Sequence, residues 1–223
     1  MNYSPLLAVA LYVLVRRWSL RAPRFWKSAI LITIGILSLG IQLTQTSFVA
    51  FANSIQLLQM GLGPVVVAFA VPLYKMRHLL KKEIGSLTLV LSVSSALAVI
   101  LGIELGRLGG LALVGQLALS AKSVTSAYAI PLMNQLGGDP ALTAGIILYV
   151  GLFGAVIAPP LLKWCFPKIS DRSLGLALGI SAHGLGTSRA SEISQKAMGY
   201  SSLAMIVMGL LTCGFLPFYL WIR

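Results

Sequence analysis

Residues 182–188 read Ala-His-Gly-Leu-Gly-Thr-Ser, and this polar stretch lies in the middle of an otherwise apolar region, residues 173–198. Breaking a helix inside a bilayer exposes backbone groups that lipid cannot satisfy. Such a break therefore persists only where protein or a water-filled cavity covers it. The stretch predicts a broken helix and marks a place where a polar site is built.

The whole chain has the composition of a membrane protein. Of its 223 residues, 57% are hydrophobic and 10% are charged, whereas a soluble domain carries roughly 25% charged residues. A transmembrane helix needs roughly 20 mainly apolar residues, so this length allows about seven crossings with short loops. We expect one all-α transmembrane domain, residues 1–223, a polytopic helical bundle with re-entrant or broken helices.

The formal net charge of +12 could indicate nucleic-acid binding, because basic clusters release phosphate counterions. Its distribution favours membrane topology instead, since Lys and Arg gather between apolar runs in the positive-inside pattern. The three clusters are Arg16, Arg17, Arg21, Arg24 and Lys27; Lys75, Arg77, Lys81 and Lys82; and Lys163, Lys168 and Arg172. We expect no nucleic-acid partner, and contact with anionic lipids as a secondary consequence.

If these clusters and Arg223 are all cytoplasmic, the N-terminus lies outside and the C-terminus inside. Residues 3–15 form a short first helix, because their basic residues follow the apolar run and do not precede it as in a signal peptide. Segments 28–44, 54–74, 84–105 and 141–162 then cross in turn. Residues 108–136 begin and end outside as a re-entrant pair, and residues 173–198 cross outward before 201–221 returns.

Residues 65–73 and 124–132 resemble each other, with five identical positions at an offset of 59. In the expected topology they run in opposite directions. Inverted repeats with broken helices that meet at the midplane are a recurrent plan of transporters. The alternative is a chance likeness between short helices rich in Ala, Val and Pro.

Two breaks supply polar groups at the start of a short helix. One begins at Lys122 and runs through Ser123 and Thr125, and the other runs from Gly184 to Ser188. A helix N-terminus offers unpaired N–H groups and a partial positive charge, which suit a small anion. Lys122 would attract a carboxylate, or its side chain would extend to the cytoplasmic headgroups.

Arg189 follows the second break, and its planar guanidinium can hold a carboxylate through two hydrogen bonds. Glu192, three residues later on the same helix face, could instead neutralise it as a structural ion pair. His183 could hydrogen-bond a substrate or transfer a proton near neutral pH. It could equally be a neutral hydrogen-bonding residue between helices.

Other polar or helix-breaking positions complete the candidate set. Asn134, ahead of a turn at Gly137 to Pro140, either lines the path or caps a helix end, and Gly63 with Pro64 permits close backbone approach. The candidate substrate-binding residues are Lys122, Ser123, Thr125, Asn134, His183, Gly186, Thr187 and Arg189. The candidate helix-break or gating residues are Gly63, Pro64, Pro72, Pro131 and Glu192.

Enzyme classes receive little support. The run from Gly179 to His183 has His where the G-x-S-x-G motif requires Gly, and no H-E-x-x-H zinc motif occurs. Two cysteines are too few for a disulfide framework, and neither has a neighbour at metal-ligand spacing. We expect no catalytic residues, no metal and no cofactor.

Several separated motifs, in the right order over nearly the whole chain, resemble the LrgB/CidB family. They are Leu62-Gly63-Pro64 with Ala70 to Tyr74, Lys122 to Thr125, Leu136-Gly137-Gly138 with Pro140 to Ala144, and Ser181 to Ala190. Residues 63–67 depart from the usual pattern, because Val replaces a hydroxyl residue near the first break. The polar positions of residues 183–189 are kept.

The resemblance implies an integral protein of the bacterial plasma (inner) membrane with a small LrgA/CidA-like membrane partner. Family members were described as holin-like or antiholin-like, and a related chloroplast protein translocates glycolate and glycerate, while bacterial pairs have been linked to pyruvate. We therefore expect a transporter of small monocarboxylates such as glycolate, glycerate or pyruvate. A regulator of murein hydrolase activity and cell lysis is the alternative. Whether the protein forms a homo-oligomer is left open.

Overall fold

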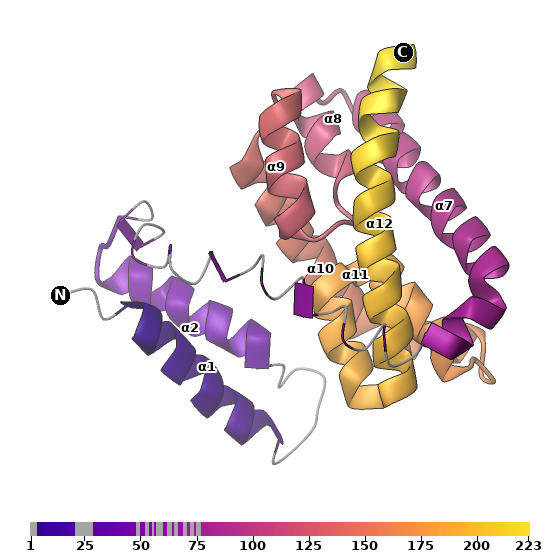
Figure 1. Ribbon diagram of the computed structural model, residues 1–223. Helices are drawn as coiled ribbons and strands as arrows, with labels where there is room; N and C mark the ends of the chain where they lie inside the picture. Colours follow the sequence, from indigo (N-terminus) through magenta and orange to yellow (C-terminus); the bar gives the residue numbers. More distant parts are fainter. Residues whose placement is uncertain are drawn as a thin grey trace. The chain divides into compact units, whose positions relative to one another are not determined.

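The computed structural model describes residues 4–20, 29–47 and 77–223, together with single positions scattered between 50 and 74. Every regular element in this part of the chain is a helix, as expected for an all-α membrane protein. The contacts divide the chain into two compact units, residues 1–65 and residues 66–223, whose helices are labelled in Figure 1. The single domain expected from the sequence stays a prediction.

The first unit contains two helices that pack against each other, α1 (Ser4–Leu20) and α2 (Ala29–Leu43). α2 coincides with the apolar segment at 28–44, whereas α1 covers the segment at 3–15 and extends five residues beyond it, so a first helix is confirmed with a later end. The Thr33 hydroxyl donates to the carbonyl of Ala29 at 2.7 Å, which satisfies a buried polar group inside an apolar helix.

The second unit contains the remaining helices whose bounds the structure describes. They are α7 (Arg77–Leu108), α8 (Leu113–Ser120), α9 (Ser126–Leu136), α10 (Pro140–Cys165), α11 (Asp171–Ile193) and α12 (Gln195–Ile222). Among the described residues, three spans are long and apolar enough to cross a membrane, Lys81–Leu108, Pro140–Cys165 and Gln195–Ile222. The expected crossing by segment 54–74 stays a prediction, because most of that segment lies outside the described residues.

Helices α7 and α12 run in the same direction and are joined by hydrogen bonds at three levels. The bonds are Tyr200 Oη to Glu83 Oε2 (2.7 Å), Ser95 Oγ with Thr212 Oγ1 (3.0 Å), and Tyr219 Oη to Glu104 Oε1 (2.7 Å). Each bond satisfies polar groups that would be expensive to leave unpaired away from water. We call the two ends of this unit the Glu83 end and the Glu104 end.

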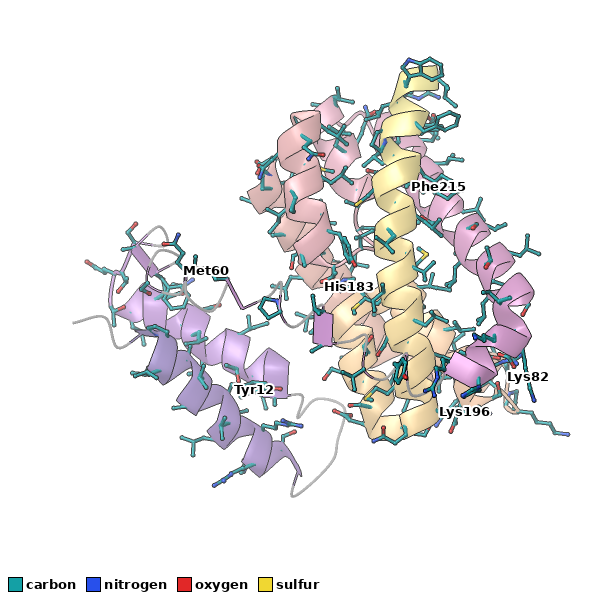
Figure 2. The ribbon with its side chains drawn as sticks, in the orientation of Figure 1. Tyr12, Met60, Lys82, His183, Lys196 and Phe215 are labelled. Carbon is teal, nitrogen blue, oxygen red and sulfur yellow. The ribbon has the colours of Figure 1, made fainter. Side chains whose placement is uncertain are left out.

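Charged residues identify what lies at each end. At the Glu83 end, Arg172 at the start of α11 pairs with Glu83, and Figure 2 shows Lys82 and Lys196 at this same end. At the Glu104 end, Glu104 lies 2.5 Å from Arg107 and 3.8 Å from Arg223. The last residue of the chain is therefore at the Glu104 end.

Glycines let neighbouring helices approach closely. A Cβ on Gly102 of α7 would lie 2.5 Å from the Cα of Ser120, so α8 packs back along α7. Gly175 and Gly179, four residues apart on α11, face α12, and a Cβ on Gly179 would lie 2.3 Å from the carbonyl oxygen of Ser201. Small residues at this spacing are typical of helices packed within a membrane.

The predicted outward crossing by residues 173–198 is wrong. His183 has φ 40° and ψ −124° in the middle of α11, and a Cβ on Gly186 would lie 2.1 Å from the carbonyl oxygen of Leu178. Eight residues of unbroken helix would span about 12 Å, so the chain reverses at His183. Helix α12 consequently starts at the Glu83 end, and Arg223 does not share a side with Lys163 and Arg172 as expected.

The close packing of α11 on α12 gives a testable prediction. Gly179→Ala should destabilise the detergent-purified protein by about 1–3 kcal/mol, because the added methyl group overlaps Ser201. The measurement is the thermal unfolding temperature. Gly214→Ala is the matched control, since nothing lies within 4 Å of its Cβ position. Equal unfolding temperatures for the two variants would contradict the packing described here.

Candidate functional site

Helices α8 and α9 form a hairpin that enters from the Glu104 end and returns to it. α8 runs back along α7, residues 121–125 form the turn, and α9 leads to Gly137, whose φ of 71° ends the helix. Asp139 then caps α10, accepting from the backbone N–H groups of Ala141 and Leu142. The predicted re-entrant pair at residues 108–136 and the predicted turn at Gly137 to Pro140 are confirmed.

Lys122 lies at the tip of this hairpin. It is half-buried, and its ammonium group donates to the main-chain carbonyl of Ala98 at 3.3 Å. Ala98 is ten residues from the end of α7, which is about 15 Å at the rise of an α-helix. The ammonium group therefore lies inside the bundle and not at a headgroup surface.

Helix α11 forms the second hairpin, which enters from the Glu83 end. Its arms, residues 171–182 and 184–193, pack through buried contacts among Leu174, Leu178 and Ala190. His183 at the tip is 4% exposed, and its Nε2 lies 3.1 Å from the carbonyl oxygen of Ile147 on α10. Because a carbonyl only accepts, Nε2 must be the donor. The predicted break at residues 182–188 is confirmed, at His183 itself.

The start of α9 and the tip at His183 contact neighbouring turns of α12. Ile147, which accepts from His183, belongs to the buried cluster that contains Ala129 of α9. On α12, the second tip lies against Met205, and the ring of Tyr128 from α9 lies against Gly209, about one helical turn further along. Figure 2 shows His183 midway along the bundle. The hairpins thus approach each other from opposite ends.

No carboxylate of the chain neutralises Lys122. All five acidic residues lie in the described part of the chain. Glu83 and Glu104 pair at the two ends, Asp139 caps α10, Glu192 pairs with Arg189, and Asp171 is exposed at the start of α11. The ammonium at the tip therefore keeps a backbone carbonyl as its partner and lacks a counter-ion from the protein.

Hydroxyl groups lie on both sides of the tips. Ser123 is buried next to Lys122, and Thr125 precedes α9 without capping it through its side chain. Thr187 is buried one turn from His183, where it donates to the His183 carbonyl at 3.0 Å and lies 2.9 Å from the Ser201 hydroxyl. Gly186 has a packing role, since its missing side chain lets the two arms of α11 meet.

Other candidate residues lie away from the tips. Asn134 is exposed near the Glu104 end of α9, and Pro131 lies within the same helix. Arg189 pairs with Glu192, the ion pair that was the alternative to a substrate role. Gly63 and Pro72 lie outside the described residues, and Pro64 is described singly, as a helical and exposed position.

Sequence reasoning missed the groups that accept hydrogen bonds from the two hairpin tips. Lys122 and His183 bond the carbonyls of Ala98 and Ile147, and a main-chain acceptor in an apolar helix leaves no signal in the residue type. The contact of Tyr128 with Gly209 was also missed, because no local pattern in the sequence pairs two residues so far apart.

The two hairpins are related to each other in sequence as well as in shape. Residues 113–129 align with residues 174–190 at an offset of 61, which places Lys122 opposite His183. The identical pairs are Leu113/Leu174, Leu117/Leu178, Ser120/Ser181, Ala121/Ala182 and Ala129/Ala190. Each hairpin also follows a long span and enters from the end where that span finishes. Hairpins that enter from opposite ends and align in this way have the pattern of an inverted repeat. The first copy of the repeat predicted at 65–73 lies mostly outside the described residues.

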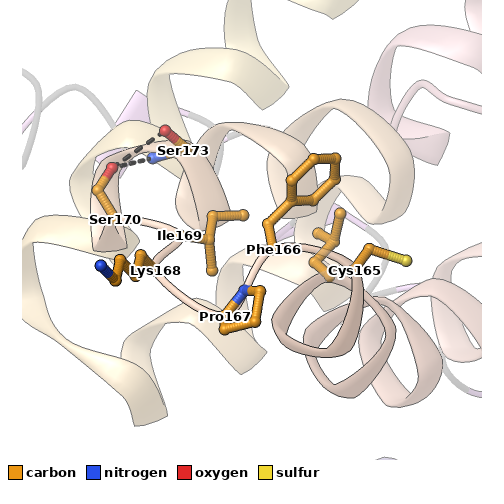
Figure 3. Close-up of a pocket in the computed structure, with 8 residues that line it drawn as sticks. Cys165, Phe166, Pro167, Lys168, Ile169, Ser170 and Ser173 are labelled. Atoms are coloured by element: carbon orange, nitrogen blue, oxygen red, sulfur yellow. Dashed lines mark hydrogen bonds between the residues drawn. The ribbon is translucent and has the colours of Figure 1, made fainter.

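A cavity of about 810 Å³ opens at the Glu83 end, around the turn between α10 and α11 (Figure 3). Its lining combines apolar side chains such as Phe166 and Ile169 with Lys168 and the hydroxyls of Ser170 and Ser173. The side chains of Lys122 and His183 are not part of it. The cavity is therefore a separate feature of this end of the unit.

A profile of the LrgB-like family matches residues 8–222, which is nearly the whole chain. The chain belongs to the LrgB-like family. The resemblance seen in the separated motifs is thereby confirmed, and the LrgB-like chain described here contains both tips within the matched region.

Several relatives of this LrgB-like chain have nearly its length. YwbG of Bacillus subtilis (strain 168) is 33% identical over 97% of this chain and 96% of its own length. YxaC of the same organism is 30% identical, over 97% and 94% respectively. Antiholin-like protein LrgB of Bacillus cereus (strain B4264) is 28% identical over 71% of this chain and 69% of its own length. No solved structure matches.

The reversal at His183 predicts the sides on which the loops of this LrgB-like protein lie. In a background with Cys165 and Cys213 replaced by Ala, Lys168→Cys and Arg223→Cys should react with a membrane-impermeant maleimide from opposite sides. The measurement compares right-side-out with inverted vesicles. Both residues are exposed, so labelling of the two positions from one side would contradict the hairpin.

Proposed function

We propose that this protein is a carrier for small monocarboxylates such as glycolate, glycerate or pyruvate. The observation that supports the proposal is the ammonium of Lys122, which lies inside the bundle without a carboxylate partner from the chain. A charged side chain at membrane depth is costly and is usually functional. A substrate carboxylate would supply the missing counter-ion.

The surroundings of the tips suit such an anion. Helix α9 begins at the tip with first-turn N–H groups that the Thr125 side chain does not cap, and the second arm of α11 begins at Gly184. A carboxylate near these helix starts is favoured by their partial positive charge. The hydroxyls of Ser123 and Thr125 offer hydrogen bonds to a neighbouring hydroxyl or keto oxygen.

Alternating access would follow from the inverted pair of hairpins. Each tip is covered from one end by its own hairpin, α8 with α9 from the Glu104 end and α11 from the Glu83 end. Movement of one hairpin at a time would open the site to one side of the membrane at a time.

The carrier is tested by flux into liposomes. The purified protein should accumulate labelled glycolate or pyruvate, and Lys122→Gln should lower the initial rate at least tenfold, about the effect of losing one charged hydrogen bond. Lys168→Gln is the matched control, because this lysine is exposed at the Glu83 end. If wild-type liposomes match empty ones, with an LrgA-like partner also present, the carrier is ruled out.

The names of relatives favour a second candidate, a holin- or antiholin-like regulator of murein hydrolase activity and cell lysis. The Bacillus cereus relatives are named antiholin-like protein LrgB. A pore needs no saturable site. Leakage of dyes regardless of their size would favour the regulator, whereas saturation and competition among hydroxy acids would favour the carrier.

The proposed setting is the inner membrane of a bacterium, with a small LrgA/CidA-like membrane protein as partner. The basic residues of the second unit gather mainly at the Glu83 end: Lys81, Lys82, Lys163, Lys168, Arg172 and Lys196. By the positive-inside rule this end is cytoplasmic. The C-terminus would then be outside, the reverse of the orientation expected from the sequence.

A further inference from the structure

We propose that His183 sets the number of negative charges that the site accepts, so that the protein selects monoanions over dianions of similar size. The inference rests on the carrier function proposed above. It follows from the inverted repeat, in which Lys122 and His183 occupy equivalent positions at the tips of the two hairpins.

Equivalent tips that both held a lysine or arginine would place two fixed cations in the interior of the unit. In this protein only the first tip carries a lysine. The imidazole of His183 is 4% exposed and bonds the carbonyl of Ile147, and no carboxylate in the described part of the chain bonds it. A positive charge on this ring would have no compensation, which makes it expensive in a buried position.

The ring is also held in place. A Cβ on Gly151 of α10 would lie 2.6 Å from Cε1 and 2.9 Å from Nε2 of His183, so the imidazole packs directly on that glycine. The ring cannot turn its Nε2 from Ile147 toward a substrate without leaving this contact. The second tip therefore contributes shape and a bound hydrogen-bond donor, but no cation.

One cation then has to balance the whole charge of the bound anion. A monocarboxylate takes the place of the Ala98 carbonyl at Lys122 and is neutralised. A dicarboxylate of similar size carries a second charge to a place with no partner, and burying an unpaired charge is strongly unfavourable. The site thus discriminates between monoanions and dianions, because His183 supplies no second positive charge.

The first experiment measures competition in the wild-type protein. Uptake of labelled pyruvate into liposomes is inhibited by unlabelled pyruvate or by malonate at pH 7.5. Malonate should need at least a tenfold higher concentration for half inhibition. Malonate competing as well as pyruvate would overturn the charge selectivity, while the carrier function would stand. Absence of pyruvate uptake would instead refute the carrier.

Substitutions at the second tip test the role of His183 itself. His183→Lys and His183→Arg should lower the half-inhibitory concentration of malonate relative to pyruvate at least tenfold. His183→Gln is the matched control, because its amide can still donate to Ile147 without adding charge, and it should keep the wild-type ratio. A folded, active Lys or Arg variant with the wild-type ratio would overturn the proposal.

Moving the cation from one tip to the other tests their equivalence. Lys122→Gln should lower the initial rate of pyruvate uptake at least tenfold, and the double variant Lys122→Gln/His183→Lys should recover at least half of the wild-type rate. Size-exclusion profiles show whether each variant is folded. If the double variant is monodisperse and as inactive as Lys122→Gln alone, the tips are not equivalent and the proposal fails.

Discussion

The structure of the second unit depends on satisfying backbone groups where a chain reverses inside a membrane. Lipid offers no hydrogen bonds, so each reversal must be enclosed by protein. At the first tip, residues 121–125 are enclosed by α7 and by the start of α9, and at the second a single residue, His183, makes the reversal against α10. Enclosing both reversals places the start of α9 and the tip at His183 on neighbouring turns of α12. The place where the backbone is hardest to satisfy is therefore also where polar groups are gathered.

Close packing makes this enclosure feasible. Gly102 admits α8 against α7, and Gly175 with Gly179 admits the first arm of α11 against α12. Gly151 leaves room for the imidazole of His183. Each glycine removes a side chain at a place where two backbones, or a backbone and a ring, must nearly touch. The fold and the candidate site thus depend on the same small residues.

Much of the fold could be predicted from the sequence because its signals are local. Apolar length predicted α7, α10 and α12, and the Gly137 to Pro140 turn separated α9 from α10. The reversal at His183 could not be predicted, because residues 173–198 are long enough to cross a membrane. A polar break is compatible both with a crossing helix and with a hairpin. A positive φ at a histidine has no signature in composition. The error displaced Arg223 to the wrong side.

The candidate site could be predicted in part for a similar reason. Lys122 and His183 are polar residues at helix breaks, and they are conspicuous in an apolar chain. Their acceptors, the carbonyls of Ala98 and Ile147, belong to apolar residues and become visible only in three dimensions. The inverted relation of the hairpins was equally hidden, since a few identities among Leu, Ala and Ser arise easily in membrane helices. The alignment supports an inverted relation only together with the structure, in which the two hairpins enter from opposite ends.

The three hydrogen bonds between α7 and α12 have a consequence for how the chain assembles. α7 is synthesised early, yet Glu83, Ser95 and Glu104 all find their partners on the last helix. Gly175 and Gly179 of α11 likewise have no packing partner until α12 is present. Until that helix is inserted, Ser95 lacks its partner Thr212, and Glu83 and Glu104 have only their ion pairs with Arg172 and Arg107. Completion of the fold therefore depends on α12, and loss of this helix should affect the whole unit and not its last part alone.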